Sequence, residues 1–263
     1  RPPSTAQVAA AVSATRLERF ISCPFKDFVA SILKPQENRE FDLTPRDVGT
    51  FYHAALECFA RENGARLSGM NEEEAIQAQV DRFQQVCELA KIVGAPVIRT
   101  EGGSPKEDCP EDLWVPAISG CILRCLDFVE DMGLILAIDN HGWITNNVDV
   151  LLGVLDTVAS PLVGTNLDTM NYRWFGYPVE TLPYVYERVA PYVKHTHFKD
   201  GTGFRKEYKG CALGEGEVPI AAAVAALKAV GYQGVWCAEY EGPRDTSADG
   251  YRRCLAWFRQ NVA

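Results

Sequence analysis

The stretch LILAIDNHG, residues 134–142, decides how the rest of the chain is interpreted. A short run of Leu, Ile and Ala ends at Asp139, and polar and turn-forming residues follow. This is the pattern of a buried parallel strand that opens into a loop. Four further runs share it: APVIRT (95–100), LVGTNLD (162–168), YVKHTH (192–197) and GVWCAE (234–239). We therefore predict five parallel strands.

Helical patterns separate these runs. A helix is expected from Asn71, which can cap it, to Gly94, which can end it. Further helices are expected near residues 117–132, 147–159, 179–190, 217–230 and 247–261. Repeated β-α units predict an α/β fold, either a doubly wound sheet or a barrel. Because a full TIM barrel needs eight strands, five strands correspond to a partial (β/α) barrel.

Two more helices are expected before residue 70. Apolar side chains recur at helical spacing over residues 13–32, where Pro24 forces a kink, and over residues 47–63. A five-stranded partial barrel has two open edges and an exposed apolar inner face. We expect these helices, or a second copy of the chain in a homo-oligomer, to cover the open side.

Composition predicts a globular protein with a packed core, since 47% of the residues are hydrophobic and 23% are charged. No run of 18 apolar residues and no secretory signal pattern occurs, so we expect a cytoplasmic protein without a membrane partner. Because the sequence does not begin with Met, we expect residue 1 to lie inside a longer product.

The net charge of −9 is spread unevenly. Residues 1–66 carry nine Lys and Arg against eight Asp and Glu, which leaves 17 against 27 for the remainder. Such a surface repels a phosphate backbone, so binding to nucleic acid is not expected. The nine cysteines are scattered and form no CxxC pair, which favours free thiols over disulfides or a zinc knuckle.

Four residues that can bind metal stand at the carboxyl ends of successive expected strands: Asp139, Asp168, His197 and Glu239. These ends open on one face of a parallel barrel, so the four side chains can converge. Three carboxylates and one imidazole suit one Mn²⁺, Mg²⁺, Co²⁺ or Zn²⁺ ion. Taken singly, an Asp at a strand end can instead cap the next helix, and a strand His can be a hydrogen-bonded core residue.

The ordered motifs AIDNHG, LDTMN, HTHFKDG, LGEGEV and WCAEYEG resemble the xylose-isomerase-like TIM barrel family of sugar phosphate isomerases and epimerases. The resemblance covers about residues 70–263 and implies a divalent-metal-dependent enzyme of carbohydrate metabolism. It also implies that the carboxylates at Asp139 and Glu239 transfer a proton next to a carbonyl, in addition to binding the metal. The substrate would then be a small sugar or polyol.

Two positions depart from the family pattern. The first ligand is commonly Glu in the family, and Asp139 is shorter by one methylene, which puts its reach to the metal in doubt. Asn171 stands where many relatives have a His. The larger ligand set that the endonuclease IV relatives need is also missing, so DNA-repair chemistry of that kind is disfavoured.

Loop residues on the same face are candidates for substrate binding, with solvated loop charge as the alternative: His141, Asn171, Lys199 and Arg205.

The segment at residues 13–62 resembles something unrelated, the start of the nuclease domain of AddB-type helicase-nuclease subunits, of the PD-(D/E)xK class. Cys23 matches a cluster cysteine there, and Gly49 with His53 matches the GxxxH motif. The acidic ligands and catalytic Lys of that class have no counterpart, so we expect an AddB-like helical fragment without catalysis over residues 1–66 and a barrel truncated on its N-terminal side over residues 70–263.

Three functions remain open from the sequence. The first is a metal-dependent sugar isomerase or epimerase. The second is an inactive metal-binding or chimeric fragment, because the missing strands would supply part of a substrate pocket. The third is a module related to DNA-repair nucleases.

Overall fold

The computed structural model describes residues 72–107, 109–243 and 247–262. Both expected N-terminal helices, over residues 13–32 and 47–63, lie outside the described residues. Chain contacts divide the protein between Gly69 and Met70. All elements named from here on belong to the second unit.

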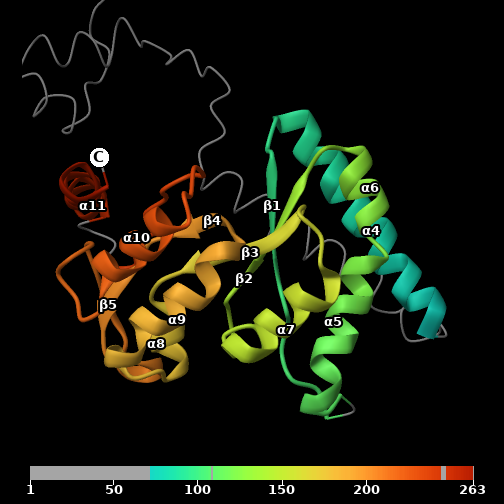
Figure 1. The fold of residues 1–263 in the computed structure, drawn as a ribbon, viewed down its shortest axis with the longest axis horizontal. Coiled ribbons are helices and arrows are strands. Elements are labelled where there is room, and N and C mark those ends of the chain that lie inside the picture. The colour runs from blue at the N-terminus through green and yellow to red at the C-terminus, as the bar shows by residue number, and fades with distance from the viewer. Residues whose placement is uncertain (1–71, 108, 244–246, 263) are drawn as a thin grey trace, which may run out of the picture. The chain divides into compact units, whose positions relative to one another are not determined.

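Four parallel strands form the central sheet, in the order β1-β2-β3-β4 (Figure 1). They are β1 (Val97–Glu101), β2 (Ile135–Asp139), β3 (Val163–Asp168) and β4 (Val193–His197). Spatial order follows chain order, and helices connect each strand to the next, as in a (β/α) barrel. The predicted α/β fold of TIM type is therefore confirmed.

Apart from α8, which the sequence does not predict, the helices stand near the ranges that the sequence predicts. They are α4 (Glu72–Val93), α5 (Trp114–Leu123), α6 (Leu126–Asp131), α7 (Val148–Val158), α8 (Asn171–Phe175), α9 (Leu182–Val189), α10 (Ile220–Ala229) and α11 (Ser247–Asn261). Short 3-10 turns occur at Glu111–Leu113, Val179–Thr181, Ala190–Tyr192 and Arg205–Glu207. No helix of the described residues is long and apolar enough to cross a membrane.

The helix expected near 117–132 is divided into α5 and α6. Between them the Cys125 N–H bonds the Ile122 carbonyl three residues back, so the backbone tightens and the α-helical ladder is interrupted. A second difference is a small antiparallel hairpin, β5 (Asp200–Thr202) with β6 (Lys209–Cys211), in a segment for which the sequence predicts a loop.

The fifth expected strand, residues 234–239, is reduced to one parallel bridge between Phe198 and Ala238. The Phe198 N–H donates to the Cys237 carbonyl at 2.7 Å, and the Glu239 N–H donates to the Phe198 carbonyl at 2.9 Å. Just before the bridge, a side-chain hydrogen bond stands in place of a backbone one: the Thr196 hydroxyl donates to the Val235 carbonyl at 2.7 Å. The segment still runs beside β4, so Glu239 arrives at the same end of the sheet as the other strand-end residues.

Alternation along the strands sends one set of side chains toward the helices. Ile98, Leu136, Ile138 and Leu167 are buried in two hydrophobic clusters that the helices complete, one around β1 and β2 and the other around β3 and β4. Leu152 of α7 packs against both clusters. The core therefore lies between the sheet and its helices.

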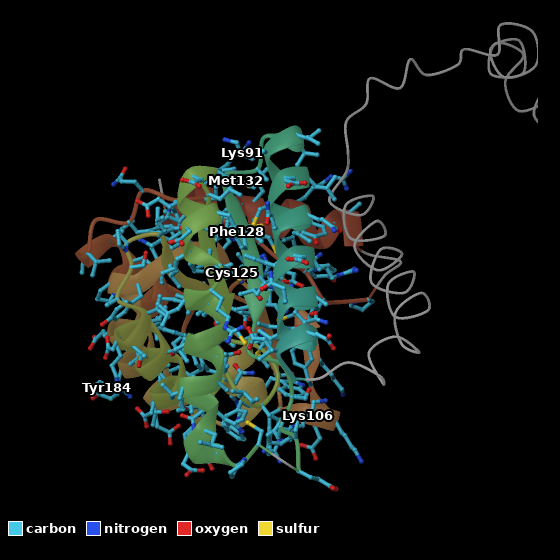
Figure 2. All side chains as sticks on the ribbon, turned by 90° about the vertical axis from the view of Figure 1, so that its right-hand side faces the viewer. Lys91, Lys106, Cys125, Phe128, Met132 and Tyr184 are labelled. Atoms are coloured by element: carbon cyan, nitrogen blue, oxygen red, sulfur yellow. The ribbon has the colours of Figure 1, made fainter. Side chains whose placement is uncertain are left out.

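Helix α4 packs beside α6 at the β1 end of the sheet. The rings of Phe83 and Phe128 lie 5.9 Å apart between centroids. Figure 2 shows Met132, Phe128 and Cys125 following one another down this side of the molecule. The seven cysteines among the described residues are all free.

The opposite face of the sheet differs from the expected apolar inner face. The alternate positions toward the carboxyl ends of the strands carry Arg99, Asp139, Asn166, His195 and His197. These polar side chains bond to one another or to loops. The prediction of an apolar inner face is wrong toward the carboxyl ends of the strands, because this part of the face carries the polar side chains of the strand ends.

Leu151 tests the core assignment because it is fully buried on α7. Replacing it with Ala should lower the free energy of unfolding by about 2–5 kcal/mol, since both transfer and cavity costs apply. Leu151→Met, which conserves volume, should cost less than about 1.5 kcal/mol. Urea unfolding of the two variants measures the difference, and equal small losses would contradict the assignment of this position to the core.

Candidate metal centre

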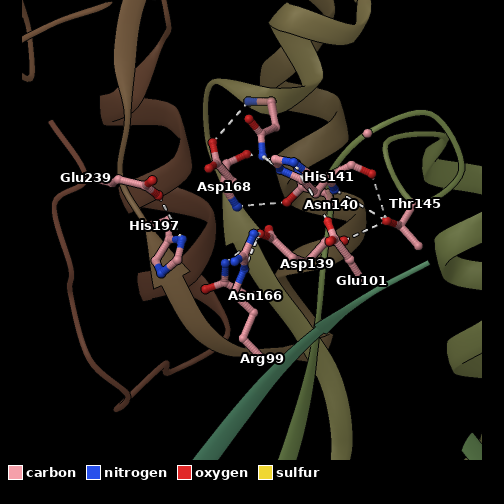
Figure 3. Close-up of polar contacts among 12 residues, drawn as sticks. Arg99, Glu101, Asp139, Asn140, His141, Thr145, Asn166, Asp168, His197 and Glu239 are labelled. Atoms are coloured by element: carbon pink, nitrogen blue, oxygen red, sulfur yellow. Dashed lines mark hydrogen bonds and ion pairs between the residues drawn. The ribbon is translucent and has the colours of Figure 1, made fainter. Parts of the chain in front are cut away.

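Three of the four predicted ligands meet at one point. Asp168 ends β3, His197 ends β4 and Glu239 follows the Phe198–Ala238 bridge (Figure 3). Each offers one ligand atom, and these atoms all lie within 4.8 Å of one another. In the part of the chain that the structure describes, this is the one group of His, Cys, Asp and Glu side chains that is close enough to hold an ion.

Two atoms of this triad lack a hydrogen bond of normal geometry among the described residues, namely Asp168 Oδ2 and His197 Nδ1. Both lie 3.0 Å from a polar partner, Asp168 Oδ2 from the Lys199 ammonium and His197 Nδ1 from Glu239 Oε2. The Asp168–Lys199 contact is an ion pair, and the Glu239–His197 contact is one only when the imidazole is protonated. Buried polar atoms need a well-placed partner, and a metal ion fits two carboxylates and an imidazole.

Asp168 combines the two roles that are open for an Asp at a strand end. Its Oδ1 accepts hydrogen bonds from the N–H groups of Met170 and Asn171 at the start of α8, at 3.0 and 3.1 Å. Its Oδ2 faces the triad. The helix-capping and metal-binding interpretations therefore apply to different oxygens of one carboxylate.

Lys199 lies beside the triad, with a side chain that is 5% exposed. Its ammonium is 3.0 Å from Asp168 Oδ2, 3.4 Å from Glu239 Oε2 and 3.1 Å from Glu241 Oε1. Burial alone would lower the pKa of Lys199, but the three carboxylates outweigh it and raise the pKa above its ordinary value. The side chain is therefore a resident cation, held where a divalent ion would share two of its carboxylate partners.

The pKa values of the two carboxylates in the triad are shifted in opposite directions. Burial raises the pKa of Asp168 to about 6, and Lys199 only partly offsets it. Burial would also raise the pKa of Glu239, but the close contact with His197 and the charge of Lys199 lower it to about 2. At neutral pH both groups are ionised, which is the form that binds metal.

Asp139, the fourth predicted ligand, is not a member of this group. It is fully buried, and Arg99 contacts its Oδ2 through both Nε and Nη2. Its Oδ1 accepts a hydrogen bond from the Asn166 amide at 3.1 Å. Both oxygens are thus engaged by neighbouring side chains, and the predicted ligand role of Asp139 stays a prediction.

The predicted substrate-binding residues are divided among three places, and Lys199 lies beside the triad. His141 and Asn171 lie together, with Nδ1 of the imidazole 3.3 Å from the Asn171 amide nitrogen, and Glu101 is 3.8 Å from the other ring nitrogen. Arg205 lies elsewhere. It donates a hydrogen bond to the Phe175 carbonyl at 3.1 Å, and its guanidinium carbon lies 4.8 Å from the centroid of the Trp143 ring.

Several residues of the site were not predicted from the sequence. Asn140 joins the loop after β2 to the end of β3, bonding both the N–H and the carbonyl of Asp168. Arg99 and Asn166 were also missed, although alternation places them on the strand face that carries the ligands. Glu241 lies two residues after Glu239 and receives a hydrogen bond from Tyr208 at 2.8 Å.

His195 shares its strand face with His197, and the ring centroids are 5.4 Å apart. Its Nδ1 is 2.9 Å from the Asn166 side-chain oxygen. Burial, followed by the neighbouring His197, lowers the pKa of His195 below the ordinary value.

A count of charges at the site supports a divalent ion. The carboxylates of Asp139, Asp168, Glu239 and Glu241 contact two permanent cations, Arg99 and Lys199. Two negative charges remain without a cation in this cluster. Clustered carboxylates that outnumber their cations repel one another, and a dication would neutralise the excess.

Comparisons with known proteins agree with this fold. A family model described as xylose isomerase-like TIM barrel matches residues 46–261. A xylose isomerase domain protein from Planctomyces limnophilus is 23% identical, with a TM-score of 0.56, over 72% of this chain and 67% of that one. The IOLI protein with a bound zinc atom is 17% identical, with a TM-score of 0.62, over 73% and 72% of the two chains.

A third similar structure is a xylose isomerase-like TIM barrel protein from Mycobacterium smegmatis in complex with magnesium. It is 19% identical, with a TM-score of 0.55, over 73% of this chain and 70% of that one. At these identities the likeness concerns the fold.

Curated relatives match over a much shorter length. An ATP-dependent helicase/deoxyribonuclease subunit of Alkaliphilus oremlandii is 44% identical over 50 residues, which is 19% of this chain and 4% of that protein. The corresponding subunit of Moorella thermoacetica is 43% identical over 75 residues, or 26% and 6%. The chain thus spans only a small part of the curated relatives that it matches.

The depressed pKa of Glu239 predicts a pH dependence of stability in the metal-free protein. A carboxyl whose pKa falls from 4.5 to about 2 on folding stabilises the folded state above pH 4.5. This contribution is lost as the pH falls from 4.5 toward 2. Glu239→Gln should therefore destabilise the protein at pH 6 and make little difference near pH 2, as measured by urea unfolding with chelator present.

Glu215→Gln is the control, since Glu215 pairs with Arg253 on the surface. Its effect should be small at every pH. A Glu239→Gln variant with the same pH profile as the wild type would contradict the inferred ion pairs.

Proposed function

Because this chain belongs to the xylose isomerase-like TIM barrel family, we propose that it is a sugar isomerase or epimerase with one divalent metal ion. The observation that carries the proposal is the Asp168–His197–Glu239 triad, with its two buried atoms that lack hydrogen bonds. Asp168 and Glu239 would supply oxygen ligands and His197 a nitrogen ligand. The remaining coordination positions would be left for substrate oxygens.

The donor set suits Mn²⁺, Mg²⁺, Co²⁺ or Zn²⁺, since these ions accept carboxylate and imidazole ligands. Related structures carry zinc in one case and magnesium in another. When bound, such an ion would polarise a carbonyl or hydroxyl oxygen of the substrate, which acidifies the adjacent C–H.

Residues of this chain would then move the proton. Glu239 is ionised at neutral pH and its side chain is 39% exposed, so a substrate can reach it as a proton acceptor as well as a ligand. Its pKa of about 2 makes it a weak base until its contacts with His197 and Lys199 loosen. Asp139 is the second acid/base that the family resemblance implies. Its bonds to Arg99 and Asn166 would have to loosen before it could take a proton, so we assign the first proton step to Glu239.

The substrate class follows from the same site. Lys199, His141 and Asn171 would donate or accept hydrogen bonds around a small polyhydroxylated molecule. One similar structure is a D-allulose 3-epimerase from Methylomonas sp. in complex with D-allulose. A ketose is therefore the substrate class to test first.

A metal-binding protein without turnover is the second candidate. Two observations favour it: Asp139 is bound on both oxygens, and the described sheet has four strands. We also retain the division into an AddB-like segment over residues 1–66 and a barrel over residues 70–263 as a proposal, although the family match begins earlier, at residue 46.

Metal titration tests the triad directly. The wild-type chain should bind one Mn²⁺ or Zn²⁺ per molecule in isothermal titration calorimetry. Losing an outer-shell partner of a metal ligand typically costs 10–100-fold in affinity, so losing a ligand in Asp168→Asn or Glu239→Gln should cost about 100-fold or more.

The matched control is Glu241→Gln. It removes one negative charge next to Lys199 without removing a proposed ligand, so its loss of affinity should be clearly smaller. Equal losses in all three variants would show that net charge, rather than coordination, governs binding and would remove the basis for the metal centre.

Proton transfer next to a carbonyl has its own readout. The metal-loaded protein in D₂O should catalyse incorporation of deuterium into a ketose at the carbon beside the carbonyl, detected by NMR. Glu239→Gln should abolish this exchange. One bound metal together with no exchange in a panel of ketoses and inositol-type ketones would favour the candidate without turnover.

A further inference from the structure

Four polar side chains cross the inner face of the sheet in one hydrogen-bonded row, with one residue from each strand. Arg99 of β1 contacts Asp139 of β2, Asp139 bonds Asn166 of β3, and Asn166 bonds His195 of β4. The last three are paired in register across the sheet. Figure 3 shows Arg99, Asp139 and Asn166 meeting beside His197 of the triad.

The donors and acceptors of this row can be arranged in only one way. A carboxylate only accepts hydrogen bonds, so the Asn166 atom 3.1 Å from Asp139 is its NH₂ group. The other end of that amide is then the oxygen, and it lies 2.9 Å from His195 Nδ1. Because an amide oxygen only accepts, Nδ1 carries the hydrogen. The neutral imidazole therefore has its lone pair on Nε2.

That lone pair is available. His195 Nε2 makes no hydrogen bond to any described residue, and the ring is only partly buried beside the proposed ligand His197. The side chain is thus a fixed acceptor on the face that carries the metal triad.

We propose that His195 is a substrate-binding residue that accepts a hydrogen bond from a sugar hydroxyl through Nε2. The Arg99–Asp139–Asn166 row keeps Nε2 an acceptor, so the subsite favours a hydroxyl over a carbonyl or phosphate oxygen, which can only accept. The proposal deepens the proposed isomerase function and rests on it for the identity of the ligand. The tautomer itself does not depend on catalysis.

A substitution at Asp139, two members along the row from His195, should reverse the tautomer. In Asp139→Asn, the new amide must turn its oxygen to Arg99, which only donates, and its NH₂ to Asn166. Asn166 must then flip to present its oxygen, which leaves its NH₂ facing His195 Nδ1. The hydrogen should move to Nε2, and the acceptor would be lost.

Nitrogen-15 NMR of histidine-labelled protein measures this at about pH 8, above the ordinary imidazole pKa of about 6.5. The wild type should show hydrogen on Nδ1 of His195, and Asp139→Asn should show it on Nε2. Glu101→Gln is the matched control. It neutralises a carboxylate that contacts His141 outside the row, so it should leave the His195 tautomer unchanged. Hydrogen on Nε2 in the wild type, or no change in Asp139→Asn, would overturn the tautomer assignment.

Ligand contact is tested in the same spectra with D-fructose and the metal-loaded protein. The wild-type Nε2 resonance should shift as the sugar is added. His195→Asn keeps an NH₂ donor for Asn166 but lacks the Nε2 acceptor, so it should weaken fructose binding about 10-fold, as expected for one lost hydrogen bond. It should not change metal affinity.

The outcomes separate the two proposals. No shift of Nε2 at any fructose concentration overturns the hydroxyl subsite, whatever the enzyme does. A shift of Nε2 without deuterium exchange in any ketose supports the subsite and counts against the isomerase. Loss of metal affinity in His195→Asn would mean that the residue supports the triad instead, which also overturns the proposal.

Discussion

Side-chain alternation on four parallel strands in register separates the hydrophobic core from the polar site. It sends Ile98, Leu136 and Ile138 outward into the helices and turns the intervening positions toward one another. Because the strands are parallel, every carboxyl end lies at the same edge, and the loops that follow begin there. A one-residue slip of β3 would bury Asn166 against the helices and remove Asp168 from the triad.

Bringing the strand ends together places several buried charges side by side around Lys199, which is energetically unfavourable. Asp168, Glu239 and Glu241 are brought within ion-pair distance of one ammonium, and the raised pKa of Asp168, about 6, shows that the cation does not fully compensate for burial. Removing charges from water is unfavourable unless their partners are well placed. A folded protein keeps such a cluster most readily when a further cation stabilises it, which is the physical basis for expecting a metal.

The strand ends could be predicted from the sequence because each is a local pattern. Asp168 and His197 end the runs LVGTNLD and YVKHTH, and each is the last residue of its strand, where the pattern places it. Glu239 reaches the site for a reason that is not local: the Thr196 hydroxyl holds residues 234–239 beside β4, where a regular strand was expected. The contacts of Arg99 and Lys199 were also unpredictable, because long flexible side chains choose partners from elements that are distant in sequence.

The side-chain length at position 139 accounts for the largest departure from the predicted ligand set. Asp139 is the last residue of β2, as predicted, and its side chain is one methylene shorter than that of a Glu. Its carboxylate therefore stays close to the sheet, within reach of Arg99 and of Asn166 on the adjacent strand. Arg99 contacts one oxygen of Asp139, and the Asn166 amide donates to the other. The Asp139 carboxylate therefore orients the Asn166 amide, whereas the longer side chain of a Glu could extend toward the triad. The same negative charge thus remains near the Asp168–His197–Glu239 triad, while the hydrogen bonds of the Asp139 carboxylate run along the sheet through Asn166 toward His195.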